Sequence, residues 1–297
     1  MLIRSLAVLV SLSALAAAEP KFEDKGKKED VKDVKDVTWT AKGEAGLVAT
    51  TGNSRTTNIT VGADATRKDK DNKVEATVAF TYARATTRTA TDANANGVID
   101  PNELSTASAT SAENLLGKLR YDRYLTGADA LYIAALAGLD KPAGMDFIGG
   151  GQAGYSRSLY KEGAHEILGE VGYDLSYLKL TAGSSSTIHS GRAFAGYKGK
   201  VEKDTALEAS VEALFNLNSV TFGMRTANAL SATRVNGLVG VTSALSSKLS
   251  LNASFTVKYT NFPAPLAKIG LPFAPGFEPE ADKTDTILKV SLIVSFL

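Results

Sequence analysis

The chain ends in the stretch TDTILKVSLIVSFL, residues 284–297, in which apolar and polar residues alternate. One face carries Leu288, Val290, Leu292, Val294 and Phe296, and the other carries Lys289, Ser291 and Ser295, with Ile293 among them. A period of two residues places successive side chains on opposite faces of a β-strand. The stretch therefore predicts a strand with one apolar face and one polar face.

The same alternation runs through most of the chain from Trp39 onward. It is clear in LSLNASFTVKYT, residues 249–260, and again over residues 166–177 and 207–217. Counting such runs predicts about twelve strands. They begin near residues 42, 55, 72, 113, 128, 145, 164, 186, 204, 233, 248 and 284.

The lengths of the connections choose between two all-β architectures. Every second connection is short, and the third, ninth and eleventh connections, all on the opposite edge, are long. Short periplasmic turns and longer external loops are typical of outer-membrane barrels. A sheet in lipid must also close on itself, because unpaired edge amides cost several kcal/mol each there. We therefore expect an all-β, antiparallel transmembrane β-barrel of about twelve strands with both termini periplasmic; a secreted β-sandwich is the alternative.

The first residues predict export. Arg4 precedes the apolar run 6–18, which ends in three alanines. This pattern is typical of a signal peptide over residues 1–18. Residues 19–38 are strongly charged and predict a periplasmic tether; a short amphipathic helix with Val31, Val34 and Val37 on one side is the alternative. The barrel itself is expected over residues 39–297, in the outer membrane of a Gram-negative-type cell.

Composition narrows the partners. The chain has 33 basic and 32 acidic residues, which argues against nucleic acid as a partner. It has no cysteine, so no disulfide framework supports it outside the cytoplasm. The expected partners are outer-membrane lipids, the barrel assembly machinery and, for an open lumen, small solutes.

If the apolar faces contact lipid, the charged faces line the lumen. Strands near residues 164, 186 and 204 would then place inward Glu166, Glu170, Asp174, Arg192, Lys198, Lys200, Glu208 and Glu212. We expect an ion-pair ladder in which Lys198 lies opposite Glu208 and diagonal to Asp174, and Lys200 lies near Glu170. A second mixed patch comprises Lys118, Arg120 and Asp122. The lumen is either a polar pathway that makes a narrow, substrate-selective channel or a packed, salt-bridged interior.

A calcium-dependent, lipid-modifying enzyme is a third possibility and is disfavoured. Its chemistry needs a serine activated by a histidine on the same face of a strand. The two histidines are His165 and His189. Ser190 follows His189 directly and would point to the opposite face, so no such pair is predicted. We therefore expect a non-enzymatic protein with no catalytic residues.

One motif predicts a metal site. The stretch DANANGVIDPNE, residues 92–103, has the spacing of an EF-hand calcium loop. Side-chain oxygens would come from Asp92, Asn94, Asn96, Asp100 and Glu103, the carbonyl from Val98, and the sharp turn from Gly97. We place this motif in an external loop over residues 88–112, where calcium would be structural. The low ligand charge predicts weak binding, on the order of 10⁻⁴–10⁻³ M.

The opening of the barrel adds a resemblance. GEAGLVATTGNSRTTNITVGADATRK, residues 43–68, resembles a bacterial family of unknown function labelled putative salt-induced outer membrane protein. The T-G-N-S turn at Thr51–Ser54 and the threonines after it carry the resemblance. It implies an outer-membrane barrel and a link to envelope or salt stress, and it supplies no catalytic residue. Phe296 has lipid-facing parity one residue before the chain end, which predicts recognition by the assembly machinery.

Overall fold

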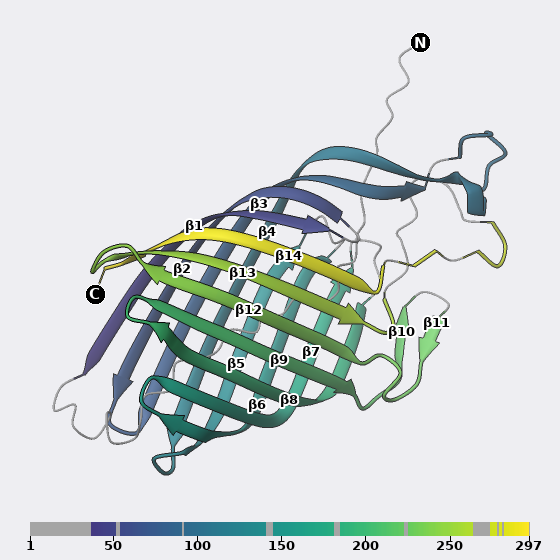
Figure 1. Ribbon diagram of the computed structural model, residues 1–297. Coiled ribbons are helices and arrows are strands. Elements are labelled where there is room, and N and C mark those ends of the chain that lie inside the picture. Colours follow the sequence, from purple (N-terminus) through teal and green to yellow (C-terminus); the bar gives the residue numbers. More distant parts are fainter. Residues whose placement is uncertain are drawn as a thin grey trace.

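The computed structural model describes residues 37–51, 54–90, 92–140, 145–180, 185–222, 225–263, 274–277, 279–280 and 282–296. In this part of the chain, twelve antiparallel strands close into a barrel (Figure 1). They are β1 (Thr38–Thr51), β2 (Ser54–Asp69), β3 (Asn72–Ala90), β4 (Leu104–Tyr124), β5 (Asp129–Asp140), β6 (Met145–Glu162), β7 (His165–Leu180), β8 (Ser185–Glu202), β9 (Thr205–Asn216), β12 (Arg234–Ala244), β13 (Leu249–Thr260) and β14 (Thr284–Ser295). The predicted fold class is confirmed.

The first and last strands close the barrel. β1 pairs with β2 on one side and with β14 on the other, and Lys42 lies opposite Ser295. The start of β1 and the end of β14 therefore lie at the same rim, as an even number of strands requires. The assignment of this rim to the periplasm stays a prediction, and residues 1–36, which hold the expected signal peptide and most of the tether, lie outside the described residues.

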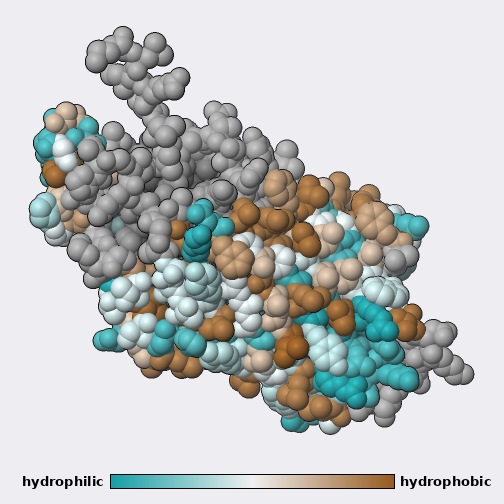
Figure 2. Space-filling view, turned by 180° about the vertical axis from the view of Figure 1, so that it is seen from behind, coloured by the Kyte–Doolittle hydropathy of each residue, from teal (hydrophilic) through white to brown (hydrophobic). Residues whose placement is uncertain are grey.

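The alternation of the sequence becomes an inside and an outside. Leu288, Leu292 and Phe255 are about half exposed, whereas Ser254 and Thr256 on the opposite face are buried. Figure 2 shows apolar residues spread over the outer face of the barrel. Such an apolar outer surface on a closed sheet suits contact with lipid. No helix among the described residues is long and apolar enough to cross a membrane.

The connection between β3 and β4 is shorter than expected. β3 continues to Ala90, and β4 begins at Leu104, which pairs with Ala90. The strand expected near residue 113 therefore starts earlier, and the loop expected over residues 88–112 is limited to the residues between Ala90 and Leu104. Pairing continues through residues 84–90 and 104–110, and this hairpin extends past the neighbouring strands (Figure 1). The boundary was misplaced because the apolar period ends in this Thr-, Ser- and Ala-rich stretch, while backbone pairing needs no apolar face. A 3₁₀ turn, η1 (Pro101–Glu103), leads into β4.

The long connection after β9 holds a small hairpin of its own, β10 (Val220–Phe222) and β11 (Arg225–Ala227). Val220 and Phe222 pack against buried apolar side chains at the ends of the neighbouring wall strands. These are Ile148 of β6, Leu178 and Leu180 of β7, and Ile188 of β8. The hairpin therefore covers an apolar part of the inner wall that would otherwise face the lumen.

Candidate functional site

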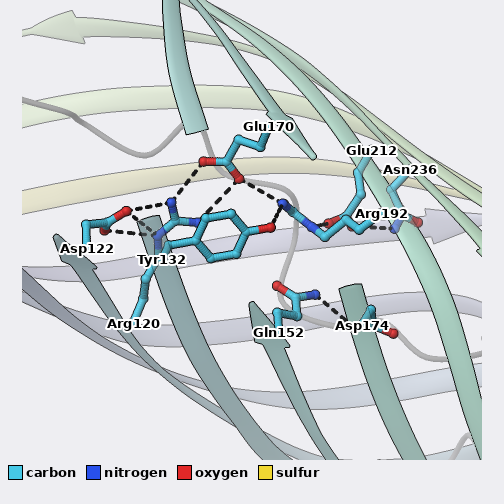
Figure 3. Close-up of polar contacts among 9 residues, drawn as sticks. All are labelled: Arg120, Asp122, Tyr132, Gln152, Glu170, Asp174, Arg192, Glu212 and Asn236. Carbon is cyan, nitrogen blue, oxygen red and sulfur yellow. Dashed lines mark hydrogen bonds and ion pairs between the residues drawn. The ribbon is translucent and has the colours of Figure 1, made fainter. Parts of the chain in front are cut away.

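The inner wall of the barrel carries two groups of hydrogen-bonded polar side chains, which we together call the lumenal network (Figure 3). Its members come from β4 to β9 and from β12, and each points inward by the alternation of its strand. They are Arg120, Asp122, Tyr132, Gln152, Glu170, Asp174, Arg192, Glu212, Arg234 and Asn236.

Two guanidinium groups share one carboxylate at the centre of this network. Arg120 Nη2 donates to Glu170 Oε1 at 2.9 Å, and Arg192 Nη1 donates to Glu170 Oε2 at 2.8 Å. Each arginine also has a carboxylate of its own. Asp122 accepts from Arg120 Nη2 at 2.7 Å, and Glu212 accepts from Arg192 Nε at 2.6 Å. The three carboxylates and two guanidiniums form one charge-assisted chain from β4 to β9.

Tyr132 joins the two arginines. The Arg120 guanidinium carbon lies 4.1 Å from the centre of the tyrosine ring, and the hydroxyl oxygen accepts from Arg192 Nη1 at 2.8 Å. Two glycines make room for this ring. A Cβ atom at Gly154 or at Gly172 would lie 2.7 or 2.6 Å from the Tyr132 hydroxyl oxygen, closer than packed atoms approach.

The rest of the network lies on β6, β7 and β12. Gln152 Nε2 donates to Asp174 Oδ2 at 3.0 Å, and Arg234 Nη2 lies 3.5 Å from Asp174 Oδ1. Asn236 Nδ2 donates to Glu212 Oε2 at 3.2 Å. Four members of the network were not predicted from the sequence, namely Tyr132, Gln152, Arg234 and Asn236. Their alternation with outward residues along each strand could have placed them in the lumen.

The network is almost fully removed from water. Arg120 is 1% exposed, Asp122 0% and Glu170 4%. Buried charges are tolerated when they are paired and hydrogen-bonded, as they are here. At this level the described side chains fill the lumen beside β4 to β9.

Part of the predicted ladder is correct and part is wrong. Lys198 lies opposite Glu208, as expected, and also opposite Glu166. Lys200 is not beside Glu170, and Lys198 is not diagonal to Asp174, because Glu170 faces Phe194 and Asp174 faces Ser190. β7 ends at Leu180 and β8 begins at Ser185, so the connection is centred before Ser185. The pairing of β7 with β8 is therefore shifted from the expected register. Arg192 and Arg120 bind Glu170 instead.

A cavity of about 390 Å³ lies in the lumen on the side of the short connections. Its charged lining is mixed, and Lys289 Nζ lies 2.5 Å from Glu44 Oε1 within it. The charged lining residues are Lys42, Glu44, Asp64, Lys68, Glu75, Lys198, Glu208 and Lys289. Polar, mixed-charge walls suit water and small hydrophilic solutes.

The two histidines lie apart from the lumen. His165 Nδ1 is 2.8 Å from the Tyr197 hydroxyl, and His189 Nδ1 is hydrogen-bonded to the Tyr173 hydroxyl. Ser190 is fully buried on the inner face. His189 and Ser190 therefore lie on opposite faces of β8, as the alternation predicts.

The residues of the calcium motif form a compact loop. Asp92 accepts from the backbone nitrogens of Asn96 and Gly97 at 3.1 and 2.9 Å, and Asn96 Oδ1 accepts from Val98 N at 2.9 Å. The side-chain amide of Asn96 donates to Asp100 Oδ2 at 3.0 Å. Asn94 makes the same kind of contact with Asp100, at 3.4 Å. Gly97 has a φ of 88°, the left-handed conformation that suits glycine at this turn.

Glu103 lies at the base of this loop. Its Oε1 accepts from Ala93 N and Asn94 N at 3.1 Å each, its Oε2 accepts from Asp100 N at 2.9 Å, and it is buried. Asp92, Asn94, Asn96 and Asp100 are thus brought together, whereas Glu103 binds backbone amides. Within the described residues, no three carboxylates, imidazoles or thiolates are grouped as a metal site. The donor set consists of hard oxygens, which fits calcium chemically.

The loop is also fixed to another connection. The buried Ile99 packs against Ala90, Leu104 and Phe277, and its carbonyl accepts from Ala274 N at 2.8 Å. The motif is therefore held between its own hairpin and the connection from β13 to β14.

The barrel is similar to solved structures of other membrane proteins. The NanC porin structure has a TM-score of 0.50 at 7% identity and covers 86% of this chain and 100% of that chain. An outer membrane channel from Pseudomonas putida F1 has a TM-score of 0.49 at 10% identity, with 93% and 100% covered. The translocator domain of the autotransporter NalP from Neisseria meningitidis has a TM-score of 0.45 at 14% identity, with 90% and 92% covered.

At 7% identity the likeness to the NanC porin is one of fold. The closed twelve-stranded barrel and its apolar outer face place the chain in the outer membrane. No curated protein matches the sequence. A model of proteins of unknown function, DUF481, matches residues 43–296. The chain therefore belongs to the DUF481 family.

Proposed function

We propose that the protein is a non-enzymatic, narrow outer-membrane channel for small polar solutes. The observation that carries the proposal is the polar lumen, which holds the paired charges of the network and, on the side of the short connections, a polar cavity of about 390 Å³. A barrel whose only task is structural can bury apolar side chains in its interior, as small filled barrels do. The lumenal network is polar. If its paired side chains moved apart, the space between them would therefore be a hydrated path rather than an apolar gap. The barrel fold shared with the NanC porin agrees with this proposal.

Planar-bilayer conductance of the purified, refolded protein tests the channel. We expect small, discrete current steps in wild type and a higher open fraction in Tyr132→Ala, because the ring that joins Arg120 and Arg192 is then lost. Tyr160→Ala is a matched control, since that tyrosine is exposed and binds Glu162 near the rim. Currents absent in all three proteins would leave a packed structural barrel. Hydrolysis of phospholipid with calcium would instead support the disfavoured enzyme.

A second part of the proposal concerns calcium. The 92–103 loop offers side-chain oxygens from Asp92, Asn94, Asn96 and Asp100, and Glu103 would complete the set if it left its backbone amides. Calcium would there neutralise the loop's carboxylates and hold its turn. We propose that calcium orders this loop structurally, without any change in a helix pair.

Hydrogen exchange of the loop amides, read by mass spectrometry, tests calcium binding. The loop has no Lys or Arg, and Arg88 lies within β3, so trypsin would report poorly on it. Millimolar calcium should slow exchange over residues 92–103, and Asp92→Ala with Glu103→Gln should abolish the effect. Magnesium at equal concentration controls for ionic strength. Equal exchange with calcium and with chelator in wild type would remove calcium from the proposal.

The expected partners stay part of the proposal. The apolar outer face suits outer-membrane lipid, and the outward, 63% exposed Phe296 suits recognition by the barrel assembly machinery. A role in envelope or salt stress rests on the resemblance of the first hairpin, where β1 ends at Thr51 and β2 begins at Ser54; Gly52 and Asn53 lie outside the described residues. Growth of a deletion strain at raised salt, with and without the restored gene, tests that role.

A further inference from the structure

One carboxylate of the lumenal network differs from the others in its surroundings. Asp122 binds Arg120 and Glu212 binds Arg192, whereas Glu170 binds both arginines. These two arginines stand on β4 and β8, on either side of β7, which carries Glu170. The Glu170 side chain therefore reaches a place where donors from two other strands meet.

The donors around Glu170 are those that proteins use to bind a dissolved carboxylate. Arg120 approaches both oxygens, at 2.9 and 3.4 Å, in the two-pronged arrangement typical of guanidinium and carboxylate. Arg192 adds a third N–H at 2.8 Å. Because each arginine is already fixed by a second carboxylate and by Tyr132, the donors keep their positions without Glu170.

We propose that Arg120 and Arg192 form a carboxylate-binding site in the lumen. Glu170 occupies this site while the channel is not conducting, and carboxylate-bearing solutes displace Glu170 as they pass through the lumen. The proposal rests on the channel function above and names its solute class. Displacement exchanges one carboxylate for another at the arginines, so their charge-assisted hydrogen bonds are replaced rather than lost, and the displaced Glu170 carboxylate is hydrated by water that enters with the solute.

The cavity provides an approach to this site. Lys198, one of its four lining lysines, lies opposite Glu166 on the lumenal face of β7. Glu170 lies on the same face of that strand, past Leu168, which packs against Phe194. The cavity lining holds four lysines and four carboxylates, so it admits an anion without a net attraction. Beyond the cavity, the anion meets an apolar pair and then the two arginines. This order suits a small solute that carries a carboxylate.

Chemical rescue tests the site without relying on conductance. Glu170→Gly removes the internal carboxylate and leaves the arginine donors without it. Formate should then raise the Tm of Glu170→Gly saturably, whereas formamide, which has the same size without the charge, should not. Glu166→Gly is the matched control: it lies on the same face of the same strand and is also buried, but it contacts Lys161 and Ser158 rather than two guanidiniums.

If Glu170→Gly folds too poorly for a melting curve, its refolding yield with formate or formamide gives the same comparison. Rescue by formate that is confined to Glu170→Gly supports the site. Equal effects of formate and formamide, or equal rescue of both glycine variants, would overturn it.

A conductance experiment separates this site from the channel itself. In wild type, gluconate should interrupt the current at concentrations where glucose does not, and Arg120→Gln should weaken the interruption. Gluconate and glucose acting alike would overturn the displacement step. If the bilayers show no current but formate rescues Glu170→Gly, the channel is rejected and the anion site is retained. Failure of the channel and failure of the anion site are therefore distinguishable.

Discussion

The strongest test of the lumenal network is the removal of Arg192. In Arg192→Met the stem of the side chain is kept, while Glu170, Glu212 and the Tyr132 hydroxyl each lose a donor at 2.6–2.8 Å. Breaking a buried ion pair by removing one partner costs about 3–5 kcal/mol. Glu170 keeps Arg120, and Glu212 keeps Asn236, so we expect a loss of about 3 kcal/mol in the free energy of unfolding.

The measurement is equilibrium unfolding in urea with the protein in lipid vesicles, followed by the gel mobility of the folded and unfolded forms. Arg157→Met is the matched control, because Arg157 is 58% exposed and 3.5 Å from Asp129. A surface pair of this kind contributes roughly 0–1 kcal/mol. In the double variant Arg192→Met with Glu212→Gln, part of the loss should return, since an unpaired buried charge has gone. Equal losses in Arg192→Met and Arg157→Met would refute the network as a stabilising unit.

Three further changes test the facing, the packing and the assembly of the barrel. Leu292→Arg, on the lipid face, should cost about 2–4 kcal/mol in the same assay, while Ser254→Lys, which lines the cavity, should cost far less; equal costs would mean that the parity is wrong. Gly172→Ala should lower the free energy of unfolding by about 1–3 kcal/mol, because its methyl would lie 2.6 Å from a backbone carbonyl oxygen and 2.6 Å from the Tyr132 hydroxyl. Gly151→Ala is the control, since its methyl would lie 3.7 Å from the nearest atom, and similar melting temperatures of the two variants would contradict the prediction. Phe296→Ser should lower the amount of heat-modifiable barrel recovered from outer membranes, and an unchanged yield would show that assembly ignores this aromatic residue.

Most of the barrel could be predicted from the alternation of the sequence. The strand around Leu292 has one face in lipid and one in the lumen, so its period of two was visible at once. The start of β4 was missed because the hairpin extends beyond the apolar part of its strands. Pairing there depends on backbone groups, which leave no periodic trace in the side chains.

The lumenal site was predictable by strand and face but not by partner. Inward parity placed Glu170, Arg192 and Glu212 in the lumen, and the pair Lys198 and Glu208 followed from a tight turn. The contact between Arg120 and Glu170 joins strands that are not neighbours in the sheet. Such contacts depend on how the sheet curves between β4 and β7 and on side-chain rotamers, neither of which the sequence pattern reports.

The position of the lumenal network bears on the order in which the barrel is built. Its ten residues lie between positions 120 and 236, on strands that are continuous in the sheet, whereas the seam between β1 and β14 lies outside this region. The seam carries the ion pair of Lys289 with Glu44 and its own backbone ladder. Separation of these two strands breaks no hydrogen bond within the network. The network can thus be completed while the sheet is still open, and the pairing most distant in sequence, which is entropically the slowest, can come last.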